Sequence, residues 1–547
     1  MLNCKKKIMK IIKYTFFITA LLLTSCNLDE TPPFLDESIY QDPASAIGAR
    51  DGMYTALTTY NTQERRLYVE NLYGGLMYTT KGGGRTTGNE QTSLNALKPG
   101  YHNDAEFLWL GLYQAISRAN GIINATDLPN DSSTLNDVAG HAFFVRGWSY
   151  FKLAELWGDV PLWLELPDSN NTNKAKSSVQ EIYAQVLSDF DNAETYLRGA
   201  DQDLGYPKKW AANMMEAKVW MKMATNPSLR DYFGYSESDC WTNAYNEAKK
   251  VYDSGQYSLL PNFSDLFNMY NGAGENTSEA IFELQISKDA ANSQMGRNFT
   301  PWRYKGTARN QHFGWFRVSR IFHDYHVSTY GTKGPGNGPA SVTIHDLRYD
   351  GTYLSEYNQA YPNPNAMARV YPSNQGGWNM GVVQPYHFKF TEKDRTSMTQ
   401  YGDQNVVDLR YAEVLLMLAE ISNELGNGQQ MMYLTPVLER AGVAGEFARP
   451  DWTLGQNAFR DAIMDEYKFE LVGEGYDGFH ARRRGYNYFL ENTIKRNNDP
   501  IASAAQTFFY SQRRFAANRD IVFSTDESQV MLLPIPLSEV NTNELID

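Results

Sequence analysis

Apolar residues recur every three or four positions through long stretches of this chain. The segment NDVAGHAFFVRGWSYFKLAELW (136–157) shows this spacing, and Gly158, Asp159 and Pro161 follow it as residues that end helices. The residues on its buried face are Val138, Ala142, Val145, Ser149, Leu153 and Leu156. The segment DLRYAEVLLMLAEISNEL (408–425) is spaced in the same way, with Gly426 as its C-cap. These patterns predict a mainly α-helical protein.

Further helices follow from the same spacing and from cap residues. Asp42 and Pro43 suit the N-cap and N1 positions of a helix that begins there. The other predicted helices are residues 105–126, 179–197, 208–224, 239–254 and 456–472. Successive helices with Ala, Gly and Ser on their packing faces favour helix pairs of the tetratricopeptide kind, although no strict repeat of about 34 residues is present.

The composition changes between about residues 261 and 407, where Gly, Pro, Asn and Tyr become frequent. Two fragments there, EAIFELQIS (279–287) and PYHFKF (385–390), are typical of strands. A loop-rich segment of this length usually carries function or covers a core. We predict one large domain in which the loop-rich insert interrupts a helical scaffold. The domain spans residues 43–547, the scaffold residues 43–260 and 408–547, and the insert about residues 261–407.

Residues 1–25 combine five Lys and no acidic residue with an apolar run from Tyr14 to Leu23. The run is too short for a stable transmembrane helix and is typical of a signal peptide, with an uncleaved membrane anchor as the alternative. It ends in Leu-Thr-Ser-Cys, which resembles the lipobox of bacterial lipoproteins. That resemblance implies cleavage before Cys26, acylation of Cys26, and a lipidated tether at residues 26–42.

An acidic composition limits the classes of partner. The 547-residue chain has a formal charge of −13 and no basic stripe, which argues against nucleic acid and anionic lipid surfaces as ligands. Of its 3 Cys, only Cys240 lies beyond the predicted lipidation site, so no disulfide is expected to hold the fold together. Aromatic residues make up 14% of the chain, and aromatic planes beside polar groups are suited to holding sugar rings.

The chain carries none of the common catalytic motifs. It has no HExxH, GxSxG or GxxxxGKS/T motif, and FHDYH (322–326) is only a weak hint of metal binding at His323, Asp324 and His326. Three Glu on one predicted helix face, followed by three Arg, are expected to form structural ion pairs rather than a pair of glycosidase acids. These residues are Glu466, Glu470 and Glu474, and Arg482, Arg483 and Arg484. DQDLG (201–205) falls short of a calcium-binding loop. We predict no catalytic residues, no cofactor and no metal, and leave structural calcium open.

Six separated stretches match the motifs of one family in that family's order. The most specific is FFVRGWSYFKLAELWGDVPL (143–162). The others are Cys26 with NLDETPP, WLGLYQAISRAN (109–120), DLRYAEVLLMLAE (408–420), DEYKFELVGEGYDGFHARRRG (465–485) and LLPIPLSEVNTNELI (532–546). On these motifs the chain resembles the SusD/RagB family of cell-surface nutrient-binding lipoproteins. It departs from the family's pattern mainly at Tyr467, Lys468, Tyr476, Gly478, Phe479 and Glu544, which puts one buried ion pair in doubt.

The resemblance implies four helix pairs beneath a more irregular layer. It also implies a lipid-anchored protein at the surface of the outer membrane of a Gram-negative bacterium. Such a protein captures an oligosaccharide or polysaccharide and delivers it to a TonB-dependent barrel of the SusC type, which it covers as a lid. The family motifs are mostly scaffold, so Arg146, Arg410, Glu413 and Glu420 are interpreted as packing and pairing residues. Peptide import is the alternative within the family, and glycoside hydrolysis or proteolysis is a less favoured hypothesis.

Two regions, residues 78–101 and the insert, offer aromatic rings beside polar side chains, which is what a glycan site needs. The predicted ligand-binding residues are Tyr78, Arg85, Asn89, Tyr101, Trp302, Tyr304, Trp315 and Trp378, and Gln91 is a further polar residue of the first region. For each ring the alternative is a place in the core, because Trp is commonly well buried. Trp109, Trp148 and Trp157 lie in the family motifs and are assigned to packing.

Overall fold

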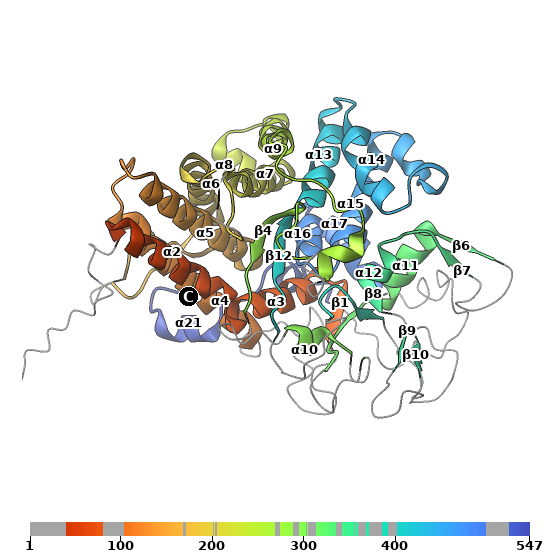
Figure 1. The fold of residues 1–547 in the computed structure, drawn as a ribbon, viewed down its shortest axis with the longest axis horizontal. Helices are drawn as coiled ribbons and strands as arrows, with labels where there is room; N and C mark the ends of the chain where they lie inside the picture. The colour runs from red at the N-terminus through yellow and green to blue at the C-terminus, as the bar shows by residue number, and fades with distance from the viewer. Residues whose placement is uncertain are drawn as a thin grey trace, which may run out of the picture.

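The computed structural model of the chain (Figure 1) is mainly helical with a few short strands, as predicted. The helices of the N-terminal half, coloured red to yellow, lie on one side of the view, and most short strands lie below the C-terminal helices. Cys26 and residues 1–25 lie outside the described residues. The structure describes residues 40–79, 103–167, 171–200, 202, 205–268, 274–287, 295–301, 304, 313–334, 342–354, 356–358, 368–370, 385–391, 402–498 and 524–546.

Helices of the N-terminal half begin and end at recognisable cap residues. Asp42 accepts a hydrogen bond from the backbone N–H of Ser45 at 2.9 Å, so it caps the first helix as predicted. The predicted helices of this half are confirmed to within a few residues at each end. The helices are α2 (Pro43–Thr58), α3 (Arg65–Gly74), α4 (Asn103–Ala125), α5 (Ser133–Trp157), α6 (Val179–Tyr196), α7 (Lys209–Thr225), α8 (Pro227–Phe233) and α9 (Glu237–Asp253).

Helices close in sequence pack against each other, as in tetratricopeptide-like pairs: α4 on α5, α5 on α6, α6 on α7, and, across the short helix α8, α7 on α9. Glycines let α5 approach α6 closely. A Cβ at Gly140 would lie 2.6 Å from the backbone nitrogen of Leu197, and one at Gly147 would lie 3.0 Å from Cε1 of Phe190. The three Trp assigned to packing are buried in the main core, with at most 4% of their surface exposed: Trp109, Trp148 and Trp157.

The C-terminal half contains one difference from the predicted helices. Residues 408–410 belong to a strand, because β12 (Val406–Arg410) pairs with β4, and α13 begins only at Tyr411. Gly426 ends α13 in the left-handed conformation, as predicted. The remaining helices are α10 (Met295–Phe299), α11 (Arg320–Tyr330), α12 (Tyr349–Thr352), α13 (Tyr411–Leu425), α14 (Gln430–Arg440), α15 (Gln456–Leu471), α16 (Tyr476–Arg483), α17 (Tyr486–Phe489), α18 (Lys495–Asn498), α20 (Glu527–Val530) and α21 (Leu537–Thr542).

The strands are short and pair antiparallel in five small sheets among the described residues. The largest has the order β1-β5-β11-β8, and both fragments predicted as strands contain one, β4 and β11. The strands are β1 (Met77–Thr79), β2 (Val160–Pro161), β3 (Lys176–Ser177), β4 (Ala280–Leu284), β5 (Phe316–Val318), β6 (Gly331–Lys333), β7 (Val342–Ile344), β8 (Tyr353–Leu354), β9 (Glu356–Asn358), β10 (Ala368–Val370), β11 (Tyr386–His387) and β12 (Val406–Arg410).

A buried network of charged side chains joins the loop-rich segment to the C-terminal helices. The carboxylate of Glu470 on α15 accepts hydrogen bonds from Nη1 of Arg410 at 2.6 Å, from Nη1 of Arg348 at 3.1 Å, and from Arg440. Burial by itself raises the pKa of Glu470, but the three guanidinium groups outweigh this and hold that pKa well below its usual range. The same Arg side chains bind further carboxylates, those of Glu279, Asp346, Glu466 and Glu474.

Structural ion pairs for these Glu are confirmed, but the predicted pairing with the three following Arg is wrong. Helix α15 ends at Leu471, so Glu474 lies beyond the helix and not on its face. Arg483 pairs with Glu420 on α13 instead, and Arg482 donates to backbone oxygens. The prediction failed because spacing within one segment carries no information about partners from distant segments.

Two departures from the family motif are accommodated by aromatic contacts. The hydroxyl of Tyr476 donates to Oδ2 of Asp408 at 2.9 Å, and the Tyr476 ring lies 3.6 Å from Nζ of Lys218 and 3.9 Å from Nζ of Lys152. The ring of Tyr467 stacks on His480 with 3.8 Å between the centroids. The buried ion pair that these departures from the family motif put in doubt is therefore replaced, at Tyr476, by cation–π contacts.

We predict that Arg410→Ala lowers the free energy of unfolding by about 3–5 kcal/mol, because it leaves buried Glu470 and Glu474 short of a cation. Chemical denaturation followed by circular dichroism measures the loss. Lys495→Ala is the control: its i,i+4 pair with Glu491 is exposed, and its removal should cost at most about 1 kcal/mol. Equal losses in the two variants would contradict a central role for the buried network.

Candidate functional site

The structure describes only part of the predicted ligand-binding set: the side chains of Tyr304 and Trp315 and the backbone of Tyr78. The others lie outside the described residues: Arg85, Asn89, Tyr101, Trp302 and Trp378. The three described residues come from separate parts of the chain, yet all three lie at the sheet β1-β5-β11-β8.

This sheet joins the two regions that the sequence pointed to. In β1, Tyr78 lies opposite Arg317 of β5, and Arg317 also lies opposite Tyr386 of β11. Trp315 immediately precedes β5, and Tyr304 packs with Tyr386 in a small apolar cluster. Antiparallel pairing of short strands therefore brings β1, at the start of the first region, beside β5 of the insert.

Two aromatic rings form a parallel stack at the start of β5. The rings of Phe313 and Trp315 lie 4.5 Å apart between centroids, with 10° between their planes, and both side chains are half-buried. The guanidinium carbon of Arg297 lies 4.3 Å from the centroid of Phe313. The backbone N–H groups of Phe313 and Trp315 donate to the carbonyl oxygens of Arg297 and Asn298, each at 2.8 Å. Helix α10 therefore holds the stack in place.

Gly314 separates the two stacked rings and has no room for a side chain. Its φ is +54°, in the left-handed region that favours glycine. A Cβ there would lie 2.6 Å from Cε1 of Tyr386 and 2.9 Å from Cα of Pro301. The close approach of this backbone to Tyr386 ties the stack to strand β11.

Tyr304 occupies a different environment from Trp315. Only 6% of its surface is exposed, and its neighbours in the apolar cluster are Leu354 and Tyr386, with Phe388 against its edge. In this structure its ring therefore supports the sheet, whereas the Phe313–Trp315 stack is partly accessible to solvent.

A layer of buried rings supports strand β5. Phe316 stacks on Phe299 of α10 at 4.6 Å and on Tyr68 of α3 at 4.5 Å between centroids. On the next position of β5, the guanidinium carbon of Arg317 lies 4.0 Å from the centroid of Tyr386, and its Nη2 donates to the Tyr386 hydroxyl at 2.8 Å. Rigid support of this kind orients side chains for binding.

Family models cover most of the chain. Residues 208–547 match the model described as SusD family. Residues 34–221 match the model described as "Starch-binding associating with outer membrane". The chain belongs to the SusD family.

Relatives of this SusD-family chain extend over nearly its whole length. It is 26% identical to "SusD-like protein P25" of Formosa agariphila over 581 aligned positions, which cover 99% of this chain and 98% of that relative. A solved surface glycan-binding protein A from Bacteroides thetaiotaomicron, in complex with laminarihexaose, is similar in fold with a TM-score of 0.64 and 18% identity; the match covers 92% of this chain and 98% of that one. A second solved structure, with xylogluco-oligosaccharide, has a TM-score of 0.67 and 18% identity over 92% of this chain and 97% of that one.

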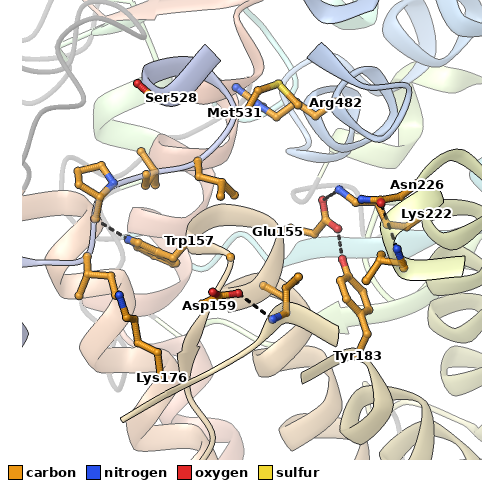
Figure 2. A pocket seen from close by; sticks show the side chains of 18 of the residues that line it. Glu155, Trp157, Asp159, Lys176, Tyr183, Lys222, Asn226, Arg482, Ser528 and Met531 are labelled. Carbon is orange, nitrogen blue, oxygen red and sulfur yellow. Dashed lines mark hydrogen bonds and ion pairs between the residues drawn. The ribbon is translucent and has the colours of Figure 1, made fainter. Parts of the chain in front are cut away.

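A separate cavity of about 850 Å³ lies between the helical scaffold of the SusD-family chain and its C-terminal segment (Figure 2). Its polar centre is Glu155, which accepts hydrogen bonds from the Tyr183 hydroxyl and from Nζ of Lys222 at 3.1 Å. Both aromatic residues of its wall are buried: Trp157 is 4% and Tyr183 1% exposed. This cavity, which the sequence did not indicate, therefore offers no open ring face for a sugar.

The His residues considered for metal binding make contacts within the fold. His326 contacts Oδ2 of Asp346 at 2.8 Å through Nε2, and His323 contacts Oδ1 of Asp324 at 3.0 Å through Nδ1. The DQDLG segment lies largely outside the described residues. Within the described ranges, no helix has the length and apolar character needed to cross a membrane.

Sequence reasoning named Trp315 but missed the two residues that complete its surroundings, Phe313 and Arg297. Phe313 could have been predicted from the sequence, because residues two apart in an extended segment share a face. Arg297 was not, since only the fold brings α10 against β5.

We expect Gly314→Ala to lower the free energy of unfolding by about 2–4 kcal/mol, because it combines an unfavourable backbone angle with a steric clash against Tyr386. The matched control is Gly428→Ala, since Gly428 has φ +78° but a Cβ added there would meet nothing within 4 Å. That control should cost about 1 kcal/mol. Chemical denaturation compares the two, and near-ultraviolet circular dichroism reports the Trp315 environment. Similar losses for both would show that the space beside Gly314 does not matter.

Proposed function

We propose that this protein is a cell-surface glycan-binding lipoprotein, without catalytic activity, that captures oligosaccharides or polysaccharides. It delivers them to a SusC-like TonB-dependent transporter in the outer membrane. The observation that carries the proposal is the Phe313–Trp315 stack, with Arg297 beside it, on the loop-rich side of the molecule. Sugar rings pack their C–H faces on such planes, and neighbouring polar groups bind their hydroxyls.

Membership of the SusD family supports a binding role rather than an enzymatic one. Two neighbours of the same fold were solved with laminarihexaose and with xylogluco-oligosaccharide. The carboxylates considered for glycoside hydrolysis, Glu466 and Glu470, are buried against Arg348. A hydrolase acid needs access to the glycosidic oxygen, which this position does not offer.

A modest affinity suits this role. Sugar hydroxyls exchange hydrogen bonds with water for hydrogen bonds with protein at small net gain, so ring stacking supplies much of the binding energy. We therefore propose Trp315, together with Trp302, Trp378 and Tyr78, as the aromatic part of the site. Arg85, Asn89 and Tyr101 belong to the same proposal as polar and aromatic contacts from the loop after β1.

The proposal predicts that residues 27–547, which retain every described residue, bind one class of soluble glycan in affinity electrophoresis and calorimetry. Trp315→Ala should weaken this binding by roughly tenfold, the loss expected for one stacking contact. Tyr232→Ala is the control, because Tyr232 on α8 is 56% exposed and lies on the helical scaffold. The affinity of the Tyr232→Ala variant for the glycan should equal that of the unaltered chain.

Three results would count against this assignment. Equal weakening by Trp315→Ala and Tyr232→Ala would place the glycan site elsewhere. Binding of a mixed peptide pool without binding of any glycan would assign the protein to peptide import. Release of reducing sugars from a bound glycan would make it an enzyme.

The lipid anchor is tested separately. Cys26→Ser is expected to move the protein from the membrane fraction to the soluble fraction and to abolish labelling by an alkyne fatty acid, because one residue would carry all acyl chains. Cys240→Ser is the matched control: this thiol is buried in α9, so its loss should leave membrane association and labelling intact. Labelling that survives in Cys26→Ser would refute the anchor.

A further inference from the structure

Three carboxylates meet where three helices of the scaffold pack together. Glu194 comes from α6, Glu216 from α7 and Glu247 from α9. One carboxylate oxygen of each lies within 4.8 Å of the other two. Oxygens bound to a single Ca²⁺ are separated by up to about 5 Å, twice the usual metal–oxygen distance of about 2.4 Å. The spacing therefore suits one shared cation.

Two buried oxygens at this cluster lack hydrogen bonds. Oε2 of Glu216 and Oδ1 of Asn213 have no hydrogen-bond partner among the described residues. Glu216 is 6% exposed and Asn213 fully buried. Asn213 lies one turn before Glu216 on α7, and its Nδ2 donates to Oε2 of Glu247 at 2.9 Å, so its amide faces the carboxylates. An unsatisfied buried oxygen is costly, and a cation would satisfy both.

The charges at the cluster are only partly balanced. Nζ of Lys250 lies 2.8 Å from Glu194 and 2.9 Å from Glu247, and its side chain is 40% exposed. Asp191 on α6 adds a fourth carboxylate whose charge acts on Glu216. A single ammonium group cannot neutralise four carboxylates, and a long half-exposed side chain can swing into solvent.

We propose that Ca²⁺ binds here, with carboxylate oxygens of Glu194, Glu216 and Glu247 and the amide oxygen of Asn213 as ligands, and that Lys250 moves aside. A set made only of oxygen donors favours Ca²⁺ over Zn²⁺, which prefers nitrogen and sulfur. Ca²⁺ tolerates irregular coordination, whereas the smaller Mg²⁺ demands near-octahedral geometry. The ion links α6, α7 and α9, of which α6 packs on α7 and α7 on α9.

Tb³⁺ luminescence tests the site directly in residues 27–547. Nε1 of Trp220 donates to Oε1 of Glu216 at 3.2 Å, so an indole ring lies beside the proposed ion. Excitation of Trp should therefore sensitise the emission of bound Tb³⁺, and added Ca²⁺ should abolish it by competition. Ca²⁺ should also raise the midpoint of thermal unfolding by a few degrees, because an ion that binds only the folded chain stabilises it.

Two variants and a matched control locate the site. Glu216→Gln should weaken Tb³⁺ and Ca²⁺ binding at least about tenfold while leaving the fold intact, because it replaces a carboxylate ligand by an amide of the same shape. Lys250→Met should tighten binding, because it removes the competing ammonium. Glu237→Gln is the control, because Glu237 is an exposed α9 carboxylate that also accepts a hydrogen bond from an indole, that of Trp241 at 3.4 Å. This substitution should change neither Tb³⁺ binding nor Ca²⁺ binding.

The proposal is overturned by absent sensitised emission, by emission that added Ca²⁺ does not abolish, or by equal emission in Glu216→Gln. If Glu216→Gln does not fold, Lys250→Met decides: tighter binding supports the site, and unchanged or weaker binding refutes it.

Discussion

The Glu470 carboxylate binds three guanidinium groups in the interior, and the arrangement of the loop-rich segment depends on it. Arg348 comes from the insert, Arg410 from the end of β12 and Arg440 from the end of α14. A buried charge without a partner is far more costly than any single apolar contact. The elements that carry these three Arg must therefore all pack against α15, so the fold depends on this network.

The same network supports the candidate glycan site. Arg348 lies just before α12 and β8, and Lys389 lies two residues after β11; Nζ of Lys389 donates to Oε1 of Glu474 at 2.5 Å and to the carbonyl oxygen of Glu470 at 2.8 Å. Strands β8 and β11 are thus tied to the end of α15 by charge. Because β11 also pairs with β5, the backbone that carries the Trp315 stack is anchored to the scaffold.

Prediction from the sequence succeeded where the decisive forces are local. Helix α5 was found from its apolar spacing and from Gly158, and α2 from its cap at Asp42, because both signals act within a few residues. It failed at residues 408–410, where pairing with β4 overrides a helical pattern. It also failed for the partners of Glu470, which lie 122, 60 and 30 residues away and come from other elements of the fold.

The sequence by itself determined the helical scaffold, its caps and the motifs of the SusD family, because these are written in neighbouring residues. Only the tertiary structure decided which rings stay partly exposed: Tyr304 is buried in the small apolar cluster with Tyr386, whereas Trp315 stacks on Phe313 and is half-buried. It also decided that Glu194, Glu216 and Glu247 share one place. The physical reason is the same in both cases, since strand pairing and helix packing bring together residues whose separation in the chain carries no signal of contact.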